Sequence, residues 1–343
     1  MSHVALTGAR GFLGWHTQCA LSLRGLEASR VAVGLNYDPQ EAERALEGAT
    51  RVIHLAGVNR ASDDEVRDGN ILFARQLADA LRRVSNPPLT VVYSNSTQAG
   101  TGSPYGDAKQ EASEVIAEVA HAVGAEFIDL RLPNLFGEHG RPFYNSVVAT
   151  FSELLAAGGS PVVEIDRELS FLHAQDAADL LIGQAADAQT FQSHLTVRAL
   201  LGRLEALAKS YRRGDFPSAD SRFDLNLLNT YRSYVFAKGP TLKGELGATV
   251  ISVIARGDSV VGTAERRVFE RLRVQSGQAR VSMRKLVTGE TVDVVLTVGG
   301  RSVVDLPALW EHSVTNLGGG ELVLERSGHT NREATDESTG ANP

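Results

Sequence analysis

Hydrophobic positions in the first 135 residues follow two alternating patterns. Short runs that are almost wholly apolar, such as residues 89–93, are typical of parallel strands buried on both faces. Longer segments in which apolar and polar residues are interspersed, such as residues 64–84, predict helices. The expected strands are 4–6, 30–35, 51–55, 89–93 and 126–132, and the expected helices are 15–23, 40–46, 64–84 and 105–123. This order predicts an α/β Rossmann-type doubly wound parallel sheet with right-handed crossovers.

From about residue 226 the pattern changes to short β-type runs separated by Gly, Asp or Asn turns. The expected strands are 250–255, 266–274, 279–286, 291–298, 302–306 and 321–326. Regularly spaced strands without helices predict a β-sandwich or barrel. The closing segment 327–343 is polar and rich in Thr, Glu, Gly and Asn, so we expect it to be disordered. The chain therefore divides into three expected regions, 1–225, 226–326 and 327–343.

Composition excludes several classes of protein. The net charge of −7 over 343 residues argues against a nucleic-acid partner. Cys19 is the single cysteine, so neither an intrachain disulfide nor a cysteine-based zinc site can form. No apolar run approaches the length of about 18 residues that spans a membrane, and the first strand begins too early for a signal peptide. We expect a cytoplasmic protein.

A glycine-rich turn follows the first strand directly. It reads Thr7-Gly8-Ala9-Arg10-Gly11-Phe12-Leu13-Gly14 and leads into the first expected helix. The chain would turn on Gly8, Gly11 would let the backbone lie against a pyrophosphate, and Gly14 would let the helix pack closely on the strand. The amide groups of the helix N-terminus would face the phosphates. This arrangement predicts a dinucleotide site.

A second motif follows the central strand. Ser94-Asn95-Ser96-Thr97 closes the strand, and Tyr105 and Lys109 lie four residues apart on the next helix, hence on one face. A nearby cation favours phenolate, so Lys109 is expected to lower the pKa of Tyr105. Ser96 could hydrogen-bond a carbonyl group from the opposite side. Together with a hydride donor, these groups are what reversible ketone reduction requires.

These motifs resemble the extended short-chain dehydrogenase/reductase family, most of whose members act on nucleotide sugars. Further marks of it are Leu55-Ala56-Gly57, Tyr105-Gly106-Asp107-Ala108-Lys109, Arg131-Leu132-Pro133-Asn134 and Phe171-Leu172-His173-Ala174-Gln175-Asp176. The resemblance implies that Tyr105 is the general acid, Lys109 its partner and a ribose contact, and Ser96 the carbonyl clamp. The cofactor contacts it implies are Gly8, Arg10, Gly11, Phe12, Leu13, Gly14, Leu55, Ala56, Gly57, Lys109, Leu132 and Asn134.

The second strand indicates which nicotinamide cofactor is used. An NAD enzyme usually carries an acid about 20 residues after the glycine turn to hold the ribose 2′-hydroxyl. Here the strand end reads Val33-Gly34-Leu35-Asn36, and Asp38 comes late. Arg10 could meet a 2′-phosphate, although an exposed loop arginine is the alternative. We expect NADP.

Four residues are expected to contact the substrate. Thr97 follows Ser96 directly, Asn134 follows the strand at 126–132, and Asn145 lies in a polar, aromatic loop. Arg167 could bind a diphosphate in a bidentate manner, although a solvated surface arginine is equally compatible with the sequence.

The β-rich half resembles a cupin barrel. Gly257, Glu270 and Gly277 fall on the frame of the first cupin motif, but Thr263 and Glu265 stand where two histidines are expected. His312 fits the second motif. Cupin metal sites need three histidines and a glutamate, and a zinc site needs at least three good protein ligands, so we expect no bound metal.

Both halves together resemble bifunctional enzymes of capsular-polysaccharide and deoxysugar pathways, in which a nucleotide-sugar reductase is fused to a metal-binding cupin epimerase. We therefore expect an NADPH-dependent ketoreductase of a dTDP- or UDP-linked 4-keto-6-deoxyhexose, forming a homodimer. Residues 1–225 would be the reductase domain with its substrate-binding part, and residues 226–326 a metal-free barrel retained for dimerisation and stability.

Three alternatives remain open at the level of sequence. The first is a 4-epimerase or dehydratase of the same family, although Thr97-Gln98 replaces the Asp-Glu pair typical of the dehydratases. The second is a protein that binds a nucleotide sugar without chemistry. The third concerns the barrel alone, in which His312, beside an acid such as Glu270, could serve as the base of a metal-independent epimerase.

Overall fold

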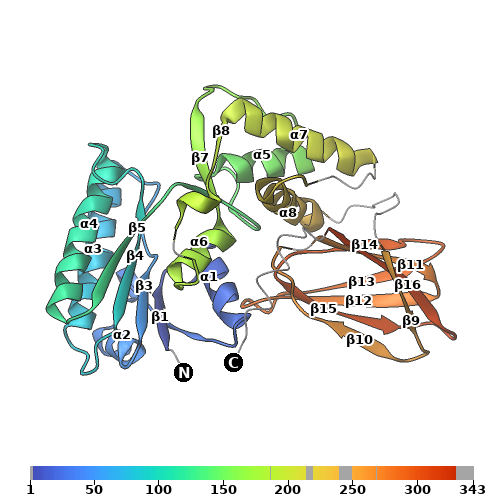
Figure 1. Ribbon diagram of the computed structural model, residues 1–343, viewed down its shortest axis with the longest axis horizontal. Coiled ribbons are helices and arrows are strands. Elements are labelled where there is room, and N and C mark those ends of the chain that lie inside the picture. The colour runs from blue at the N-terminus through green and yellow to red at the C-terminus, as the bar shows by residue number, and fades with distance from the viewer. Residues whose placement is uncertain (1–2, 186, 214–218, 239–248, 268, 330–343) are drawn as a thin grey trace. The chain divides into compact units, whose positions relative to one another are not determined.

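The computed structural model describes residues 3–185, 187–213, 219–238, 249–267 and 269–329. The chain forms two compact units, each built from several segments. The first comprises Met1–Phe136, Phe143–Ser146 and Leu169–His194, and the second comprises Gly137–Pro142, Val147–Glu168 and Leu195–Pro343. Figure 1 shows the helices and strands of both units.

The first unit contains a five-stranded parallel sheet. Its strands are β1 (Val4–Thr7), β2 (Ala28–Val31), β3 (Arg51–His54), β4 (Thr90–Ser96) and β5 (Glu126–Leu132), in the order β2-β1-β3-β4-β5. The order reverses between β1 and β3, and in such sheets ligands bind beyond the carboxyl ends of the strands at the point of reversal.

Helices cover both faces of this sheet (Figure 1). They are α1 (Phe12–Ser22), α2 (Pro39–Leu46), α3 (Asp63–Leu81), α4 (Pro104–Ala122) and α6 (Ala174–Leu181). One apolar cluster joins α2, α3 and α4 to the sheet, and a second cluster joins α1 and α6 to it. The predicted α/β Rossmann-type doubly wound parallel sheet is confirmed.

The second strand ends earlier than the sequence predicted. Strand β2 stops at Val31, and a short 3₁₀ helix, η1 (Gly34–Asn36), replaces the second half of the expected strand 30–35. The physical reason is Gly34, whose φ of 78° turns the chain out of the extended conformation. Its amide donates to Gln76 Oε1 at 2.6 Å, and Leu35 is fully exposed.

A three-stranded sheet and three longer helices follow. The sheet has the order β6-β7-β8, from β6 (Asn134–Phe136), β7 (Glu168–His173) and β8 (Ser193–Thr196). The second unit contains α5 (Val147–Ala156), α7 (Val197–Arg213) and α8 (Arg222–Ala237), and the short η2 (Gln189–Phe191) precedes β8. Helix α8 crosses residue 226, so the prediction that helices stop there was wrong; eleven of its side chains are buried from Leu225 to Val235.

Two antiparallel four-stranded sheets complete the second unit, and we call them the β domain. The first has the order β10-β15-β12-β13 and the second the order β14-β11-β16-β9. Their bounds are β9 (Thr249–Ile254), β10 (Ser259–Gly262), β11 (Phe269–Ser276), β12 (Gln278–Lys285), β13 (Thr291–Thr297), β14 (Val303–Leu306), β15 (Trp310–Asn316) and β16 (Leu322–His329). One apolar cluster draws side chains from both sheets, so the predicted all-β, cupin-like second region is confirmed.

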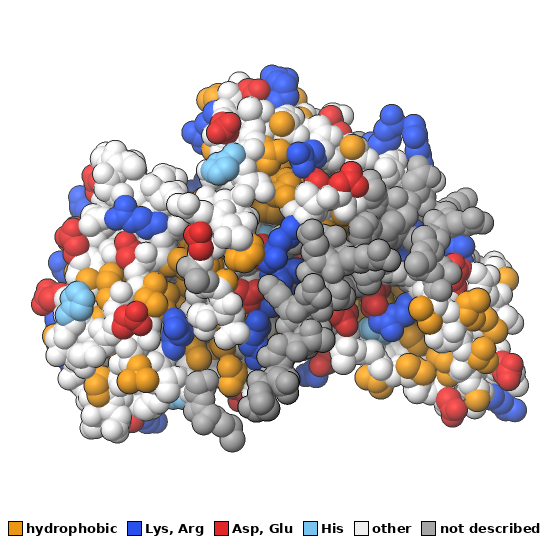
Figure 2. All heavy atoms as spheres, viewed as in Figure 1, with side chains coloured by type: hydrophobic (Ala, Val, Ile, Leu, Met, Phe, Trp, Pro, Cys, Tyr) orange, Lys and Arg blue, Asp and Glu red, His pale blue; other side chains and the backbone are white. Residues whose placement is uncertain are grey.

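Two details of the β domain differ from the prediction. Strands β10 and β15 were not expected, and the segment expected to be disordered, 327–343, begins inside β16, while residues 330–343 lie outside the described residues. Apolar side chains are exposed on β9 and β10, and Figure 2 shows hydrophobic side chains gathered over this part of the molecule.

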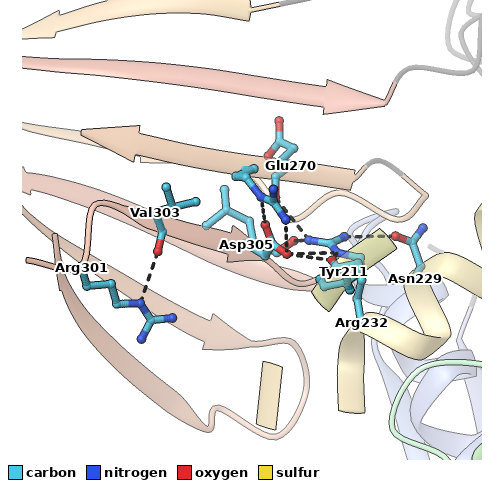
Figure 3. Close-up of polar contacts among 9 residues, drawn as sticks. Tyr211, Asn229, Arg232, Glu270, Arg301, Val303 and Asp305 are labelled. Carbon is cyan, nitrogen blue, oxygen red and sulfur yellow. Dashed lines mark hydrogen bonds and ion pairs between the residues drawn. The ribbon is translucent and has the colours of Figure 1, made fainter. Parts of the chain in front are cut away.

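A buried charge network joins α7 and α8 to the β domain (Figure 3). Asp305 on β14 accepts from Arg271 Nε at 2.6 Å and from the Tyr211 hydroxyl at 2.8 Å. Arg232 on α8 donates to that hydroxyl at 2.9 Å and to the Leu306 carbonyl at 3.0 Å. Burial raises the pKa of Tyr211, which keeps its hydroxyl protonated and able to donate. Because the helices share this network with the strands, the second unit begins well before residue 226.

Across the ranges described above, we find no helix with the length and apolar character needed to cross a membrane.

Candidate active site

The glycine turn lies between β1 and α1, at the carboxyl end of β1. Gly8 has a φ of 66°, and a Cβ atom there would lie 2.7 Å from the Ala56 nitrogen. A Cβ atom on Gly14 would overlap the Gly8 carbonyl oxygen. Gly11 precedes the first residue of α1, and its amide donates to the Gly8 carbonyl at 2.9 Å. No side chain caps the N-terminus of α1. The turn thus forms a cradle that side chains would fill, and it presents a helix N-terminus, as a pyrophosphate site requires.

A threonine and a histidine connect the ends of β1 and β3. Thr7 Oγ1 lies 2.8 Å from His54 Nδ1, and it accepts from the amides of Leu55 at 3.0 Å and Ala56 at 3.2 Å. Burial lowers the pKa of His54 to about 3, with the charge of Lys109 as a smaller cause. His54 is therefore a neutral, structural histidine that helps hold Leu55-Ala56-Gly57 beside the glycine turn.

Ser96 and Tyr105 meet at the carboxyl end of β4. Ser96 is the last residue of that strand, and its side chain lies near enough to Tyr105, in the first turn of α4, to affect the pKa of the phenol. Two features place this turn: Ser103 caps α4 by accepting from the Gly106 amide at 3.1 Å, and a Cβ atom on Gly106 would overlap the Gln98 carbonyl oxygen. The structure thus places the predicted proton donor and carbonyl clamp near each other.

Lys109 lies one turn further along α4 and is buried against β4. Its Nζ donates to the Ser94 carbonyl at 2.6 Å and lies 4.1 Å from the centre of the Tyr93 ring. Burial lowers the pKa of Lys109 to about 7, and the charge of Asp129 opposes this shift. The ammonium group is therefore held by a main-chain oxygen and an aromatic face.

The predicted effect of Lys109 on the pKa of Tyr105 was wrong. Burial raises the pKa of Tyr105, and the Ser96 hydrogen bond opposes this only in part. The physical reason is that removal from water disfavours the phenolate more than the neighbouring groups favour it. The phenol is consequently protonated at neutral pH, which is the form that can donate a proton.

Residues predicted on the cofactor side lie around the glycine turn. Phe12 and Leu13 are half-buried in the first turn of α1, and Arg10 is exposed in the turn itself. Leu132 is buried at the end of β5. Asp38, which follows β2 later than the acid of a typical NAD enzyme, caps α2. Its carboxylate accepts from the amides of Gln40 at 2.8 Å and Glu41 at 2.9 Å. Its carboxylate thus already serves two helix amides.

The residues predicted to contact the substrate divide between the two units. Thr97 is exposed after Ser96, and its amide donates to the Leu132 carbonyl at 3.0 Å. Asn134 on β6 is exposed and donates to the Ser170 carbonyl at 3.1 Å. Asn145 is also exposed, whereas Arg167 is an exposed residue of the second unit. Three of the four residues therefore belong to the first unit.

Sequence reasoning missed three polar residues of the first unit. Asn95 Nδ2 donates to Asp129 Oδ1 at 2.7 Å, and Asn95 Oδ1 accepts from the Ser96 amide at 2.8 Å. Arg60 donates to the carbonyl oxygens of Phe143, at 3.3 Å, and Tyr144, which fixes the segment before Asn145. One feature of the sequence could have indicated Asn95. Side chains alternate along β4, so Tyr93 and Asn95 lie on one face.

The residues at the cupin motif positions of the β domain, Glu270 and His312, are not arranged to bind a metal ion. Arg326 donates to Glu270 Oε1 at 2.8 Å and forms an ion pair with it, so this carboxylate is already neutralised. His312 on β15 is buried, and its ring lies against its cross-strand partner Gly262 on β10, where a Cβ atom would overlap it. Burial lowers the pKa of His312 to about 4, with the charge of Arg326 as a further cause. Over the described ranges, no group of three or more His, Cys, Asp and Glu side chains is placed to hold a metal ion.

Two known protein families match successive parts of the chain. Residues 4–193 match the NAD dependent epimerase/dehydratase family, and residues 247–329 match the family described as polysaccharide biosynthesis C-terminal domain. The UDP-2-acetamido-2,6-beta-L-arabino-hexul-4-ose reductase of Pseudomonas aeruginosa is 24% identical over 355 residues, which cover 94% of this chain and 93% of that protein.

Solved structures share the fold. The capsular polysaccharide assembling protein CapF of Staphylococcus aureus has a TM-score of 0.60 at 24% identity and covers 96% of both chains. RMD of Pseudomonas aeruginosa, solved as a complex with NADPH, has a TM-score of 0.54 at 19% identity and covers 69% of this chain and 100% of its own. The first of these likenesses extends over both units.

Proposed function

The chain belongs to the NAD dependent epimerase/dehydratase family, and from that premise we propose that it is an NADPH-dependent ketoreductase acting on a nucleotide-activated 4-keto-6-deoxyhexose. Family membership confirms the resemblance that the motifs had indicated. One observation carries the proposal further: a protonated Tyr105, near Ser96, lies one helical turn from a buried Lys109 at the carboxyl end of β4. This is the arrangement needed to protonate a ketone oxygen.

The substrate class is supported by the reductase of Pseudomonas aeruginosa, whose name describes a UDP-linked hexul-4-ose. We infer that this chain reduces the 4-keto group of a UDP-linked deoxysugar, with the dTDP-linked sugar as the alternative. Thr97, Asn134 and Asn145 would contact the sugar, and Arg167 the diphosphate.

NADPH is supported over NADH by two features of the first unit. The carboxylate of Asp38 caps α2, and Arg10 is exposed in the glycine turn, where a 2′-phosphate could meet it. The structural relative RMD was solved with NADPH. The turn residues 8–14, Leu55-Ala56-Gly57, Leu132 and Asn134 would line the cofactor site, and Lys109 would contact its ribose.

The chemistry follows from the protonation states of the site. Bound at the glycine turn, NADPH supplies the hydride that adds to the keto carbon. Tyr105 gives its phenolic proton to the keto oxygen, and the Ser96 hydroxyl donates a hydrogen bond to the same oxygen. Lys109 stabilises the phenolate that remains until solvent reprotonates it. The ketone would thus become a secondary alcohol.

The β domain has a structural role in this proposal. Because Glu270 is paired with Arg326 and the His312 ring is packed against Gly262 of β10, the domain would be metal-free and retained for stability and dimerisation. Homodimerisation is supported by β9 and β10, which are edge strands with exposed apolar side chains: Ile251 is 66% and Val261 79% exposed. Light scattering should show a dimer for the wild type and a monomer for Ile251→Lys or Val261→Lys.

A screen of UDP- and dTDP-linked 4-keto-6-deoxyhexoses tests the function. The proposal expects NADPH oxidation with the UDP sugar and a product whose new hydroxyl group is seen by NMR. The family also contains epimerases and dehydratases, which recycle bound NAD. Conversion of a nucleotide sugar without net oxidation of NADPH would favour that alternative.

A further inference from the structure

Asp129 lies on β5 and belongs to none of the motifs that indicated the site. Its partner across the sheet is Tyr93 of β4, and its side chain is one-quarter exposed. Asp129 Oδ1 accepts from Asn95 Nδ2 at 2.7 Å, and Asn95 Oδ1 accepts from the Ser96 amide at 2.8 Å. A chain of two hydrogen bonds therefore connects Asp129 to the backbone of the predicted carbonyl clamp.

The same carboxylate acts electrostatically on Lys109. Tyr93 neighbours both residues: its ring lies under the Lys109 ammonium group, and its backbone pairs with Asp129. The negative charge of Asp129 raises the pKa of Lys109 and so opposes the larger effect of burial. Asp129 Oδ2 also accepts from Arg131 Nε at 3.2 Å, but Arg131 is half-exposed and water screens its charge.

Three titratable groups near Lys109 are uncharged. His54 on β3 is neutral because burial lowers its pKa to about 3. Burial also raises the pKa values of Tyr93 on β4 and Tyr105 on α4, so both phenols carry their protons. Burial is the larger cause of the lowered pKa of Lys109, and the charge that opposes it comes from Asp129 on β5.

We propose that Asp129 is a positioning residue of the active site, which orients Ser96 through Asn95 and supplies the negative charge that holds Lys109 as an ammonium ion. The assignment rests on the proposed function, since it gives Asp129 a role in the same reduction. Two separate effects are expected from one carboxylate, and they can be measured separately.

The protonation of Lys109 can be followed without any substrate. The chain has five lysines, so ¹³C labelling at the lysine Cε gives few signals, and Lys109→Met identifies the one of interest. The signal should titrate near pH 7 in the wild type. In Asp129→Asn the midpoint should fall by about 1 pH unit, because an opposite charge nearby stabilises an ammonium group by this order. Asp129→Glu should restore it, and Glu126→Gln, at the exposed start of the same strand, should leave it unchanged.

Activity then tests the second effect. In Asp129→Asn the alkaline limb of kcat/KM should move to lower pH with the Lys109 midpoint, because less ammonium remains at each pH. Asn95→Ala should lower kcat severalfold while the Lys109 midpoint and the KM for NADPH stay at their wild-type values.

An unchanged Lys109 midpoint in Asp129→Asn would overturn the proposal, as would an Asn95→Ala enzyme with wild-type kcat. A lowered midpoint in a protein that reduces no keto sugar would instead support the electrostatic role of Asp129 and count against the proposed function alone.

Discussion

Lys109 in the first unit and Arg326 in the β domain are two basic side chains, each beside a residue that a family motif assigns to chemistry. That residue is Tyr105 for Lys109 and Glu270 for Arg326. Lys109 donates to a main-chain carbonyl and lies against an aromatic ring, with a protonated phenol one turn away. Arg326 forms an ion pair with the Glu270 carboxylate. The two cations thus differ in their direct partners: the carboxylate that pairs with Arg326 is already neutralised, whereas the direct contacts of Lys109 are with uncharged groups, and the charge of Asp129 acts on it in addition.

The same contrast appears in how the two regions use buried polar groups. In the first unit Thr7, Ser96 and Asn95 fix backbone segments at the carboxyl ends of strands, where ligands bind. In the second unit Arg232, Arg271 and Asp305 are buried against one another between helices and strands. We conclude that polar groups serve a site in the first unit and cohesion in the second.

The largest expected effect is on catalysis. Tyr105→Phe removes the proton donor, and kcat for keto-sugar reduction should fall by about 10²–10⁴-fold, the usual contribution of general acid catalysis. NADPH affinity should stay at the wild-type value, because the glycine turn is untouched. Stopped-flow reduction and fluorescence titration of NADPH measure the two quantities. Near wild-type turnover would remove the chemistry from this site.

The next effect is on the stability of the second unit. Asp305→Asn leaves two buried guanidinium groups without a carboxylate, which should destabilise the unit by about 3–5 kcal/mol. Denaturant unfolding measures the change, and Asp293→Asn, on the exposed side of β13, is the matched control. NADPH affinity should not change. A loss of NADPH binding in the folded variant would contradict the division of roles between the two regions.

A smaller effect is expected at the glycine turn. Gly8→Ala forces alanine into a left-handed conformation, which costs about 1–2 kcal/mol, and its Cβ would also press on Ala56. Gly25→Ala is the control, because Gly25 has nearly the same φ, 67° against 66°, but no neighbour within 4 Å. NADPH affinity should fall in the first variant alone. Equal affinities in the two variants would show that the turn does not position the cofactor.

The smallest effect concerns the cupin frame. Arg326→Met removes a partly exposed ion pair, so the stability should change by no more than about 1 kcal/mol. Arg273→Met breaks a second pair between the same strands, with Glu325 at 3.7 Å, and should behave alike. A chelator should leave the melting temperature of the wild type unchanged. Zinc in the purified protein, or a fall in melting temperature with the chelator, would contradict the metal-free account.

Local spacing made much of the first unit predictable. Gly8, Gly11 and Gly14, and likewise Tyr105 and Lys109, lie within one turn or helix, so short-range geometry fixes their relation. Asp129 and Asn95 meet only through the register of β4 and β5, which the sequence does not state. Strand β15 was missed because His312 and Asn316 occupy its buried face, so its apolar alternation is broken. Helix α8 was missed because long-range contacts bury it.

The central claim is that hydride passes from NADPH to the keto carbon of a nucleotide sugar. The most direct test uses NADPH carrying deuterium at the transferred position, with a UDP-linked 4-keto-6-deoxyhexose and NMR analysis of the product. We expect deuterium at carbon 4 in amounts equal to the NADPH oxidised, with both slowed together in Tyr105→Phe. A converted sugar that carries no deuterium, with the NADPH left intact, would contradict it.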